Sequence, residues 1–182
     1  PYTPTIADEL SKLDPYGYYS FFDIQYMALV VNKDLEAELG ITINGYQDLL
    51  NPALKGKIIQ ADPAASSSAY RQFHTILALM GDEFGDDKAW EYIDELIKNC
   101  DGVITTSSST VFKSVISGEY VVGLTYENIV EMQITINGAD NIRLVYPVEG
   151  NTACASGAAM IKDCPRPEAA AAFLDFCASA DY

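Results

Sequence analysis

Two short runs of hydroxyl-bearing residues could line a binding site for a negatively charged ligand. The first is Ser66–Ser68, inside the segment 62–70 (DPAASSSAY), and the second is the segment 105–110 (TTSSST). Each run stands just before a predicted helix. The unpaired amides and the positive dipole end at a helix N-terminus bind phosphate, phosphonate or carboxylate groups. Small hydroxyls beside them add hydrogen-bond donors without bulk, so both runs are candidate anion-binding segments.

Helix capping is the simpler interpretation of the same runs. Most Ser and Thr residues just before a helix only accept an amide hydrogen of the first turn, which stabilises the helix by about 1 kcal/mol. One serine per run is enough for that, so the surplus hydroxyls are what favour a ligand. If the runs follow adjacent parallel strands, they converge on one crevice. Its candidate ligand-binding residues are Ser66, Ser67, Ser68, Ala69, Ser107, Ser108 and Ser109.

A third candidate segment is Tyr126-Glu127-Asn128, which follows a predicted strand at 120–125. As an ordinary loop turn it would hold a half-buried tyrosine and a solvated glutamate. As part of the site, Tyr126 and Asn128 would hydrogen-bond the ligand, and Glu127 would bind an amine or lie at a hinge. Both interpretations stay open.

Alternating strands and helices must position these segments. Apolar runs and turn residues predict an α/β fold with a mostly parallel sheet flanked by helices, and ligand sites in such folds lie beyond the carboxyl ends of the strands. The predicted strands are 24–31, 58–61, 103–104, 120–125, 142–146 and 157–161, and the predicted helices are 34–39, 69–80, 87–100, 111–116 and 165–177, with a short broken helix within 45–57.

The composition argues against several classes of function. The chain has 182 residues and a formal net charge of −15, and its 11 Lys and Arg residues form no cluster, so neither nucleic acid nor an anionic membrane is an expected partner. The cysteines (Cys100, Cys154, Cys164 and Cys177) lack C-x-x-C spacing and a neighbouring histidine, so no metal site is expected. Disulfide formation stays open. We interpret the chain, which starts at Pro1, as a mature or trimmed fragment.

Catalysis is not expected, and no cofactor motif is present. The sole histidine, His74, falls within a predicted helix, and the sequence has no G-x-S-x-G elbow, no P-loop and no G-x-G-x-x-G fingerprint. An enzyme that uses Ser67 or Ser108 as its nucleophile is the alternative from another class. We therefore expect a binding protein without catalytic residues.

The chain resembles the periplasmic-type solute-binding proteins of ABC importers. The closest branch is similar to the ferric iron-binding and 2-aminoethylphosphonate-binding group, and the likeness extends over nearly the whole chain. The segments that carry it are NKDL (32–35), YQDLLNPALKGKI (46–58), ADPAASSSAY (61–70), TTSSSTVFKSVISGEYVVGLTYEN (105–128), VYPVEGN (145–151) and GAAMIKDCPRPEAAAAFLDFCAS (157–179).

The resemblance implies a type II periplasmic binding protein fold, in which two lobes close over the ligand. Residues 1–27 would be a crossover segment between lobes, 28–144 the second lobe, and 145–182 the returning hinge and a segment that packs on a missing first lobe. That packing surface would be exposed here, or covered by a second copy of the chain. The implied partner is an ABC permease, and the implied location is extracytoplasmic, either periplasmic or on the cell surface as a lipoprotein.

The resemblance also bears on the ligand. In the family, the turn that matches Ser66–Ala69 binds phosphate-like oxygens, and the position of Tyr126 is where ferric binders carry two adjacent tyrosines. Here Glu127 follows Tyr126, so we expect a small phosphate- or phosphonate-bearing solute, whose amine could pair with Glu127. Ferric iron with a synergistic anion is the alternative. A further alternative is that this lobe alone binds nothing.

Overall fold

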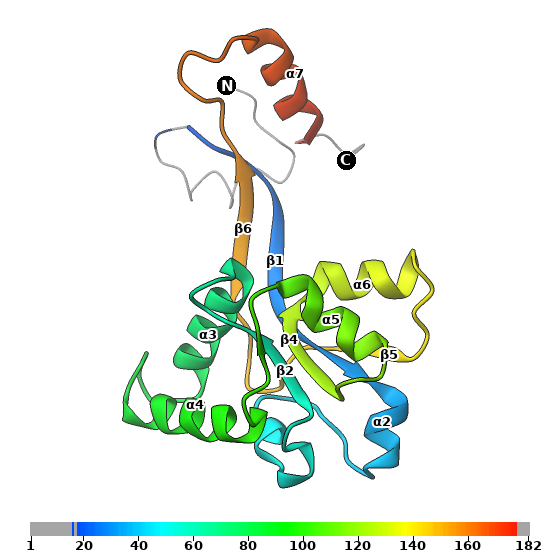
Figure 1. Cartoon of the computed structure of the whole chain (residues 1–182). Helices are drawn as coiled ribbons and strands as arrows, with labels where there is room; N and C mark the ends of the chain where they lie inside the picture. The colour runs from blue at the N-terminus through cyan, green and yellow to red at the C-terminus, as the bar shows by residue number, and fades with distance from the viewer. Residues whose placement is uncertain (1–15, 17, 178–182) are drawn as a thin grey trace. The chain divides into compact units, whose positions relative to one another are not determined.

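The computed structural model describes residue 16 and residues 18–177, and the chain divides into two compact units (Figure 1). The sheet unit is Tyr26–Thr152. The terminal unit combines Pro1–Gln25 with Ala153–Tyr182. The long strand β1 (Ser20–Asn32) contributes residues to both units. The lobe boundaries expected from the sequence, after residues 27 and 144, remain a prediction.

The sheet unit holds a mixed sheet with the strand order β3-β2-β4-β1-β5. Strand β2 (Ile58–Ala61) is parallel to β3 (Ile104–Thr105) and β4 (Val122–Tyr126), while β1 is antiparallel to β4 and to β5 (Ile142–Val145). Strands β2 to β5 therefore share one direction and β1 runs against them. This confirms the predicted α/β class with a mostly parallel sheet; the reversed strand β1 was not foreseen.

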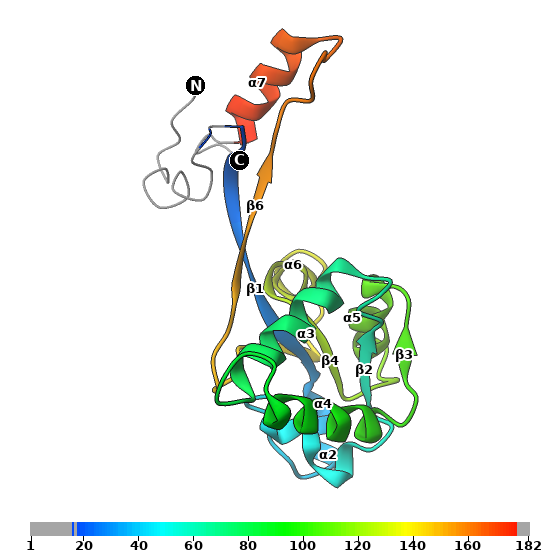
Figure 2. The ribbon, with the colours of Figure 1, turned by 90° about the vertical axis from the view of Figure 1, so that its left-hand side faces the viewer.

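Helices cover both faces of this sheet (Figure 2). On one face, Leu29 and Leu124 join a core with α3 (Ser67–Leu79) and α4 (Asp87–Cys100). On the other face, Val30 joins a core with α5 (Ser108–Ile116) and α6 (Glu127–Thr135). Because neighbouring residues of a strand point to opposite faces, a central strand covered on both sides is apolar throughout. Residues 27–31 of β1, MALVV, are at most 1% exposed.

The shorter elements are α2 (Lys33–Glu38) and the 3-10 turns η2 (Gln47–Leu50) and η3 (Pro52–Leu54). These turns replace the broken helix expected within 45–57. Caps set the helix ends: Asn32 accepts two amide hydrogens of α2, and Asp86 accepts one from Ala89 at the start of α4. None of the helices among the described residues is long and apolar enough to cross a membrane.

Glycine at position 123 allows α5 to lie directly against β4. A Cβ atom there would lie 2.6 Å from Val111 Cγ1, 3.1 Å from Val30 Cγ1 and 3.2 Å from Val115 Cγ2. We expect Gly123→Ala to lower the free energy of unfolding by about 1–3 kcal/mol through overpacking. Urea unfolding of both variants would measure it. Val111→Ala should lower the free energy of unfolding by less in the Gly123→Ala variant than in the unmodified protein. Equal losses would show that overpacking against Val111 is not the cause.

In the terminal unit, β6 (Ala153–Ala158) pairs with β1, and α7 (Pro167–Cys177) follows. The strand predicted at 157–161 is therefore wrong by about four residues. Glycine at 157 allows the observed strand to lie close to Phe21, because a Cβ there would lie 2.7 Å from the Phe21 ring. Apolar side chains remain exposed in this unit, including Ile161 (72%) and Phe173 (61%). All four cysteines are free thiols.

Candidate ligand-binding site

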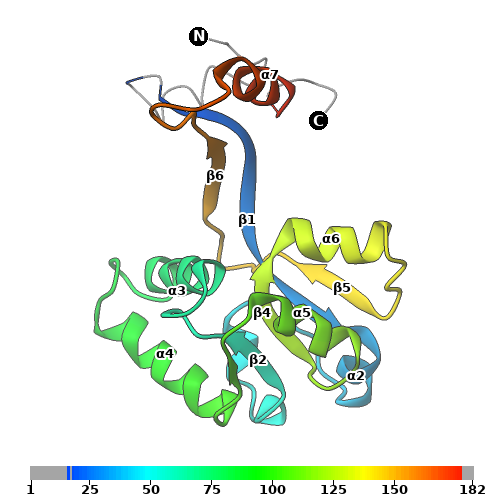
Figure 3. The same cartoon turned by 45° about the horizontal axis from the view of Figure 1, so that its top comes forward.

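Three helices of the sheet unit begin at the same end of the sheet, beyond the carboxyl ends of its parallel strands (Figure 3). Helix α3 follows β2, α5 follows β3, and α6 begins directly after the last residue of β4. These strands are adjacent and parallel, with Ala61 opposite Thr105 and Ile59 opposite Gly123. The two hydroxyl-rich runs therefore follow adjacent parallel strands, which is the arrangement needed for a shared crevice.

The start of α3 is weakly capped. Ser66 is the capping residue, but its Oγ atom lies 3.4 Å from the amide nitrogen of Ala69, and it also lies 3.0 Å from Ser68 Oγ. Within the described part of the chain, the amide hydrogens of Ser67 and Ser68 have no acceptor. Two donors therefore point out of the helix start without a partner.

The start of α5 has no side-chain cap at all. Ser107 occupies the capping position, yet its Oγ atom pairs with Ser109 Oγ at 2.9 Å and accepts no amide hydrogen. The amides of Ser108 and Ser109 also lack an acceptor among residues 18–177. Capping therefore does not account for the second run, and the two serine runs share one pattern, in which hydroxyls pair at i and i+2 beside unpaired amides.

Buried and partly buried side-chain amides hold both helices in place. Asn32 Nδ2 donates to Val115 O at 2.9 Å and Asn141 Nδ2 donates to Ile116 O at 2.8 Å, which fixes the C-terminal end of α5. In α3, Gln72 Nε2 donates to Ala28 O of β1 at 3.1 Å, and Gln72 Oε1 accepts from the hydroxyl of Tyr46. Because buried polar groups cost energy without partners, these contacts restrict the helices to one position.

The segment Tyr126-Glu127-Asn128 is not a loop but the start of α6, so its placement in a loop turn was wrong, while its role in ligand binding stays a prediction. Tyr126 is the capping residue without a side-chain cap, and Glu127 is the first helical residue. The Tyr146 hydroxyl donates a hydrogen bond to the Glu127 carboxylate. Asn128 is exposed. Tyr146 was missed because its nearness to Glu127 depends on β1, which pairs with both β4 and β5.

The contact with Glu127 changes the acidity of Tyr146. The hydrogen bond to Glu127, partial burial and the nearby negative charge raise the pKa of Tyr146 to about 12. We expect Glu127→Gln to lower the pKa of Tyr146 toward its ordinary value of 10.0, as measured by NMR titration of labelled tyrosine rings. Glu131→Gln, which removes a weaker charge interaction, is the control; an equal effect of both substitutions would contradict the contact.

A buried hydroxyl lies next to these residues. Thr125 is 3% exposed, and its Oγ1 atom has no hydrogen-bond partner in the described structure. Because side chains alternate along a strand, Thr125 lies on the same face of β4 as Gly123, the face that α5 covers. The described residues hold no group of three or more His, Cys, Asp or Glu side chains suited to a metal ion.

Comparison with known proteins identifies relatives of the chain. The structure of the periplasmic binding protein AfuA from Actinobacillus pleuropneumoniae, with fructose-6-phosphate bound, is 27% identical with a TM-score of 0.74, and the match covers 90% of this chain and 50% of AfuA. The periplasmic binding protein P5PA is 26% identical with a TM-score of 0.77, over 94% of this chain and 53% of P5PA. Iron-bound HitA from Pseudomonas aeruginosa shares the fold at 23% identity, with a TM-score of 0.70, over 92% of this chain and 53% of HitA.

The chain thus spans about half the length of these relatives. A sequence model of the family described as bacterial extracellular solute-binding protein matches residues 2–182. The resemblance to solute-binding proteins is confirmed at this level, and the chain belongs to the bacterial extracellular solute-binding protein family.

Proposed function

We propose that the chain is the second lobe of an extracytoplasmic solute-binding protein of an ABC importer, and that it binds a small solute bearing a phosphate or phosphonate group. The observation that carries the proposal is the pair of incompletely capped helix starts at adjacent strand ends. There, the amides of Ser67, Ser68, Ser108 and Ser109 lack acceptors among the described residues. An anionic oxygen is the natural acceptor for such amides.

The overall negative charge does not exclude an anionic solute. At physiological salt, surface charges more than about 8 Å away are largely screened, whereas amides in direct contact with the ligand are not. Phosphate oxygens at these helix starts would also meet the hydroxyls of both serine runs. Charge-assisted hydrogen bonds of this kind are stronger than neutral ones.

The start of α6 would recognise the other end of the solute. Glu127 and Tyr146 form a hydrogen-bonded pair beside Tyr126. A carboxylate held in this way suits a solute hydroxyl or ammonium group, and the exposed Asn128 adds an amide. The partnerless hydroxyl of Thr125 gives further support, because a buried polar atom without a partner is costly unless a water or ligand satisfies it.

Ferric iron with a synergistic anion is the second candidate. It is favoured by the phenols of Tyr126 and Tyr146 beside the Glu127 carboxylate, since hard oxygen ligands suit Fe(III), and by the shared fold of iron-bound HitA. Against it, Glu127 stands where ferric binders would carry a second adjacent tyrosine. A coloured iron complex that disappears in Tyr126→Phe would favour iron over a phosphate ester.

The partners follow from the family and from the length of its members. Because the matched proteins are about twice as long, we infer that a first lobe packs on the exposed apolar residues of the terminal unit, such as Ile161 and Phe173. A second copy of this chain is the alternative occupant. The remaining partners would be an ABC permease, with the protein in the periplasm or anchored as a lipoprotein.

A catalytic role for the serines receives no support from their surroundings. The ring of His74, the only histidine in the sequence, lies against Tyr70 at 4.3 Å and Phe84 at 5.6 Å between centroids. It makes no hydrogen bond to Ser67 or Ser108 in the described structure. A serine nucleophile needs such a base.

Titration calorimetry of the full-length protein, as its gene encodes it, tests the proposal. Fructose 6-phosphate, 2-aminoethylphosphonate and inorganic phosphate are the probes. We expect at least one of these probes to bind saturably. The double variant Ser107→Ala with Ser109→Ala should bind that probe more weakly. No binding of any probe would overturn the phosphate proposal, and the same titration with this chain alone tells whether one lobe suffices.

A further inference from the structure

The outer surface of α3 and α4 carries an exposed apolar area, which we name the α3–α4 patch. Phe73 of α3 packs edge-on against Trp90 of α4, with ring centroids 5.6 Å apart, and it also contacts His74 of the ring pair His74–Phe84. The patch comprises Tyr70 (53% exposed), Phe73, Phe84 (61%), Trp90 (50%), Ile97 (46%) and Ile104 (50%). Contiguous exposed apolar areas of this kind mark interaction sites on soluble proteins.

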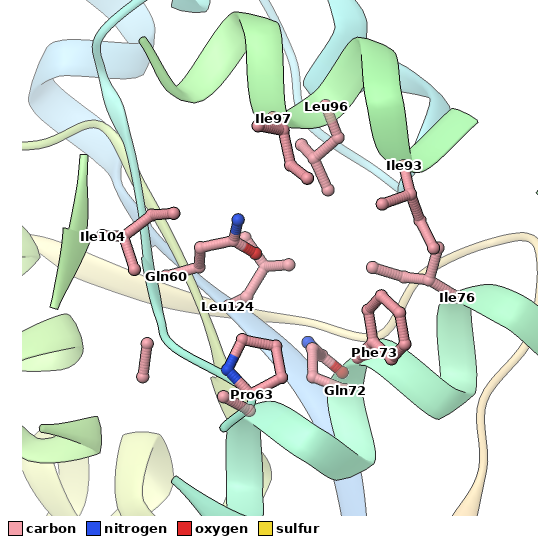
Figure 4. Close-up of a pocket in the computed structure, with 12 residues that line it drawn as sticks. Gln60, Pro63, Gln72, Phe73, Ile76, Ile93, Leu96, Ile97, Ile104 and Leu124 are labelled. Carbon is pink, nitrogen blue, oxygen red and sulfur yellow. The ribbon is translucent and has the colours of Figure 1, made fainter. Parts of the chain in front are cut away.

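A hollow opens within the patch (Figure 4). Its walls come from Phe73 and Ile76 of α3, Ile97 of α4 and Ile104 of the edge strand β3. Its volume is about 90 Å³, which is roughly the volume of three water molecules or of one aliphatic side chain. A few side chains seated in pockets inside a larger interface commonly carry most of the binding energy of a complex.

The rim of the patch is acidic. Asp87, Glu91 and Asp94 line a surface hollow together with Trp90. Nearby lysines are already engaged, Lys88 by Asp82 at 2.8 Å and Lys98 by Asp94 at 3.3 Å. The carboxylates of Asp87 and Glu91 have no ion-pair or hydrogen-bond partner in residues 18–177. An exposed tryptophan beside unpaired carboxylates favours a cationic group, through both charge and the ring face.

We propose that the α3–α4 patch docks a protein segment that inserts one large apolar side chain into the hollow and places Lys or Arg on the acidic rim. Charge decides between this occupant and a second copy of the chain. Each copy has a formal net charge of −15, so two acidic rims would repel each other. The hollow adjoins the start of α3, because Ala69 also lines it, but the inference rests on the apolar and acidic side chains of the patch and does not depend on the nature of the solute.

A library of random short peptides displayed on phage, selected on the immobilised chain, tests the proposal. We expect enriched peptides with a large apolar residue next to Lys or Arg. Their synthetic versions should change the fluorescence of Trp90, the only tryptophan in the chain, and bind more weakly at high salt. Replacing the apolar anchor of the peptide by Ala should weaken binding by about tenfold or more.

Substitutions of exposed residues distinguish the patch from non-specific attraction. Ile97→Ser with Ile104→Ser should weaken peptide binding by about tenfold, and Asp87→Asn with Glu91→Gln should remove most of its salt dependence. Ile136→Ser, which alters a 76% exposed isoleucine just after α6, is the matched control and should leave binding unchanged. The proposal is overturned if no peptide is enriched or if the enriched peptides lack basic residues. It is also overturned if sedimentation shows a dimer of the chain that Ile97→Ser with Ile104→Ser converts to a monomer.

Discussion

Proline at both Ser67 and Ser108 is expected to weaken binding of a phosphate-bearing solute by about a hundredfold or more. Each serine is the first residue of its helix, where proline is well tolerated because the lost amide hydrogen has no helical acceptor. The preceding residues, Ser66 (φ −134°, ψ 124°) and Ser107 (φ −119°, ψ 121°), already have the extended conformation that proline requires. The substitutions therefore remove two ligand donors and leave the fold intact.

The size of this effect follows from the strength of single bonds. A hydrogen bond to a charged group contributes about 1.5–3 kcal/mol, which is about a tenfold to hundredfold change in affinity per lost amide. Calorimetry with the phosphate probe that binds the unmodified protein most tightly measures it. Ser67→Ala with Ser108→Ala, which keeps both amides, is the control and should lose much less. If the proline and alanine variants bind equally well, the amides do not hold the solute.

Replacing Arg143 by methionine is expected to lower the free energy of unfolding by about 3 kcal/mol. Arg143 donates to both carboxylate oxygens of Glu36, at 2.6 and 3.0 Å, and to Ile43 O at 2.7 Å. The Glu36 side chain is 11% exposed, so the substitution leaves a carboxylate in a largely buried place without its cation. Urea unfolding at neutral pH measures the loss, and Lys33→Met, at an exposed position of α2, is the control.

The same pair predicts the pH dependence of stability. Burial by itself would raise the pKa of Glu36, but the hydrogen bonds from Arg143 and the Ile43 amide, with the charge of Arg143, bring it below its ordinary value of 4.5. The unfolded chain therefore takes up this proton first as the pH falls. The ion pair stabilises the fold fully above about pH 4.5 and is lost as the pH falls through the folded-state pKa. The difference in free energy of unfolding between Arg143→Met and the unmodified protein should decrease at low pH. A difference that does not change with pH would show that it does not come from the ion pair.

Local sequence patterns predicted the bounds of those helices and strands whose structure depends mainly on their own residues. Strand 58–61 and helix 87–100 were predicted with their observed bounds; in α4, Asp86 caps the start and Asp101, with a left-handed φ of 52°, follows the last residue. Helix α6 was missed because its sequence, ENIVEMQIT, is rich in β-branched residues that favour strands. Packing of the fully buried Val130 against the second core overrides that preference.

The same distinction between local sequence signals and contacts made by the fold applies to the candidate site. The serine runs were visible because each is contiguous in the sequence and precedes a helix. Their unpaired amides were not, because whether a serine caps its helix or pairs with the next hydroxyl is decided by geometry. Tyr146 could not be assigned to Glu127 without knowing that β1 pairs Met27 with Tyr126 and Leu29 with Val145.

The position of β1 between β4 and β5 also limits how early the sheet unit can complete its folding. Its residues emerge from the ribosome early, yet Leu29 pairs with Leu124 and with Val145, so its buried run stays unpaired until most of the unit has been synthesised. Contacts between such distant residues slow folding because a long loop must close first. The pairing of β1 can therefore be completed only after residue 145 has been synthesised.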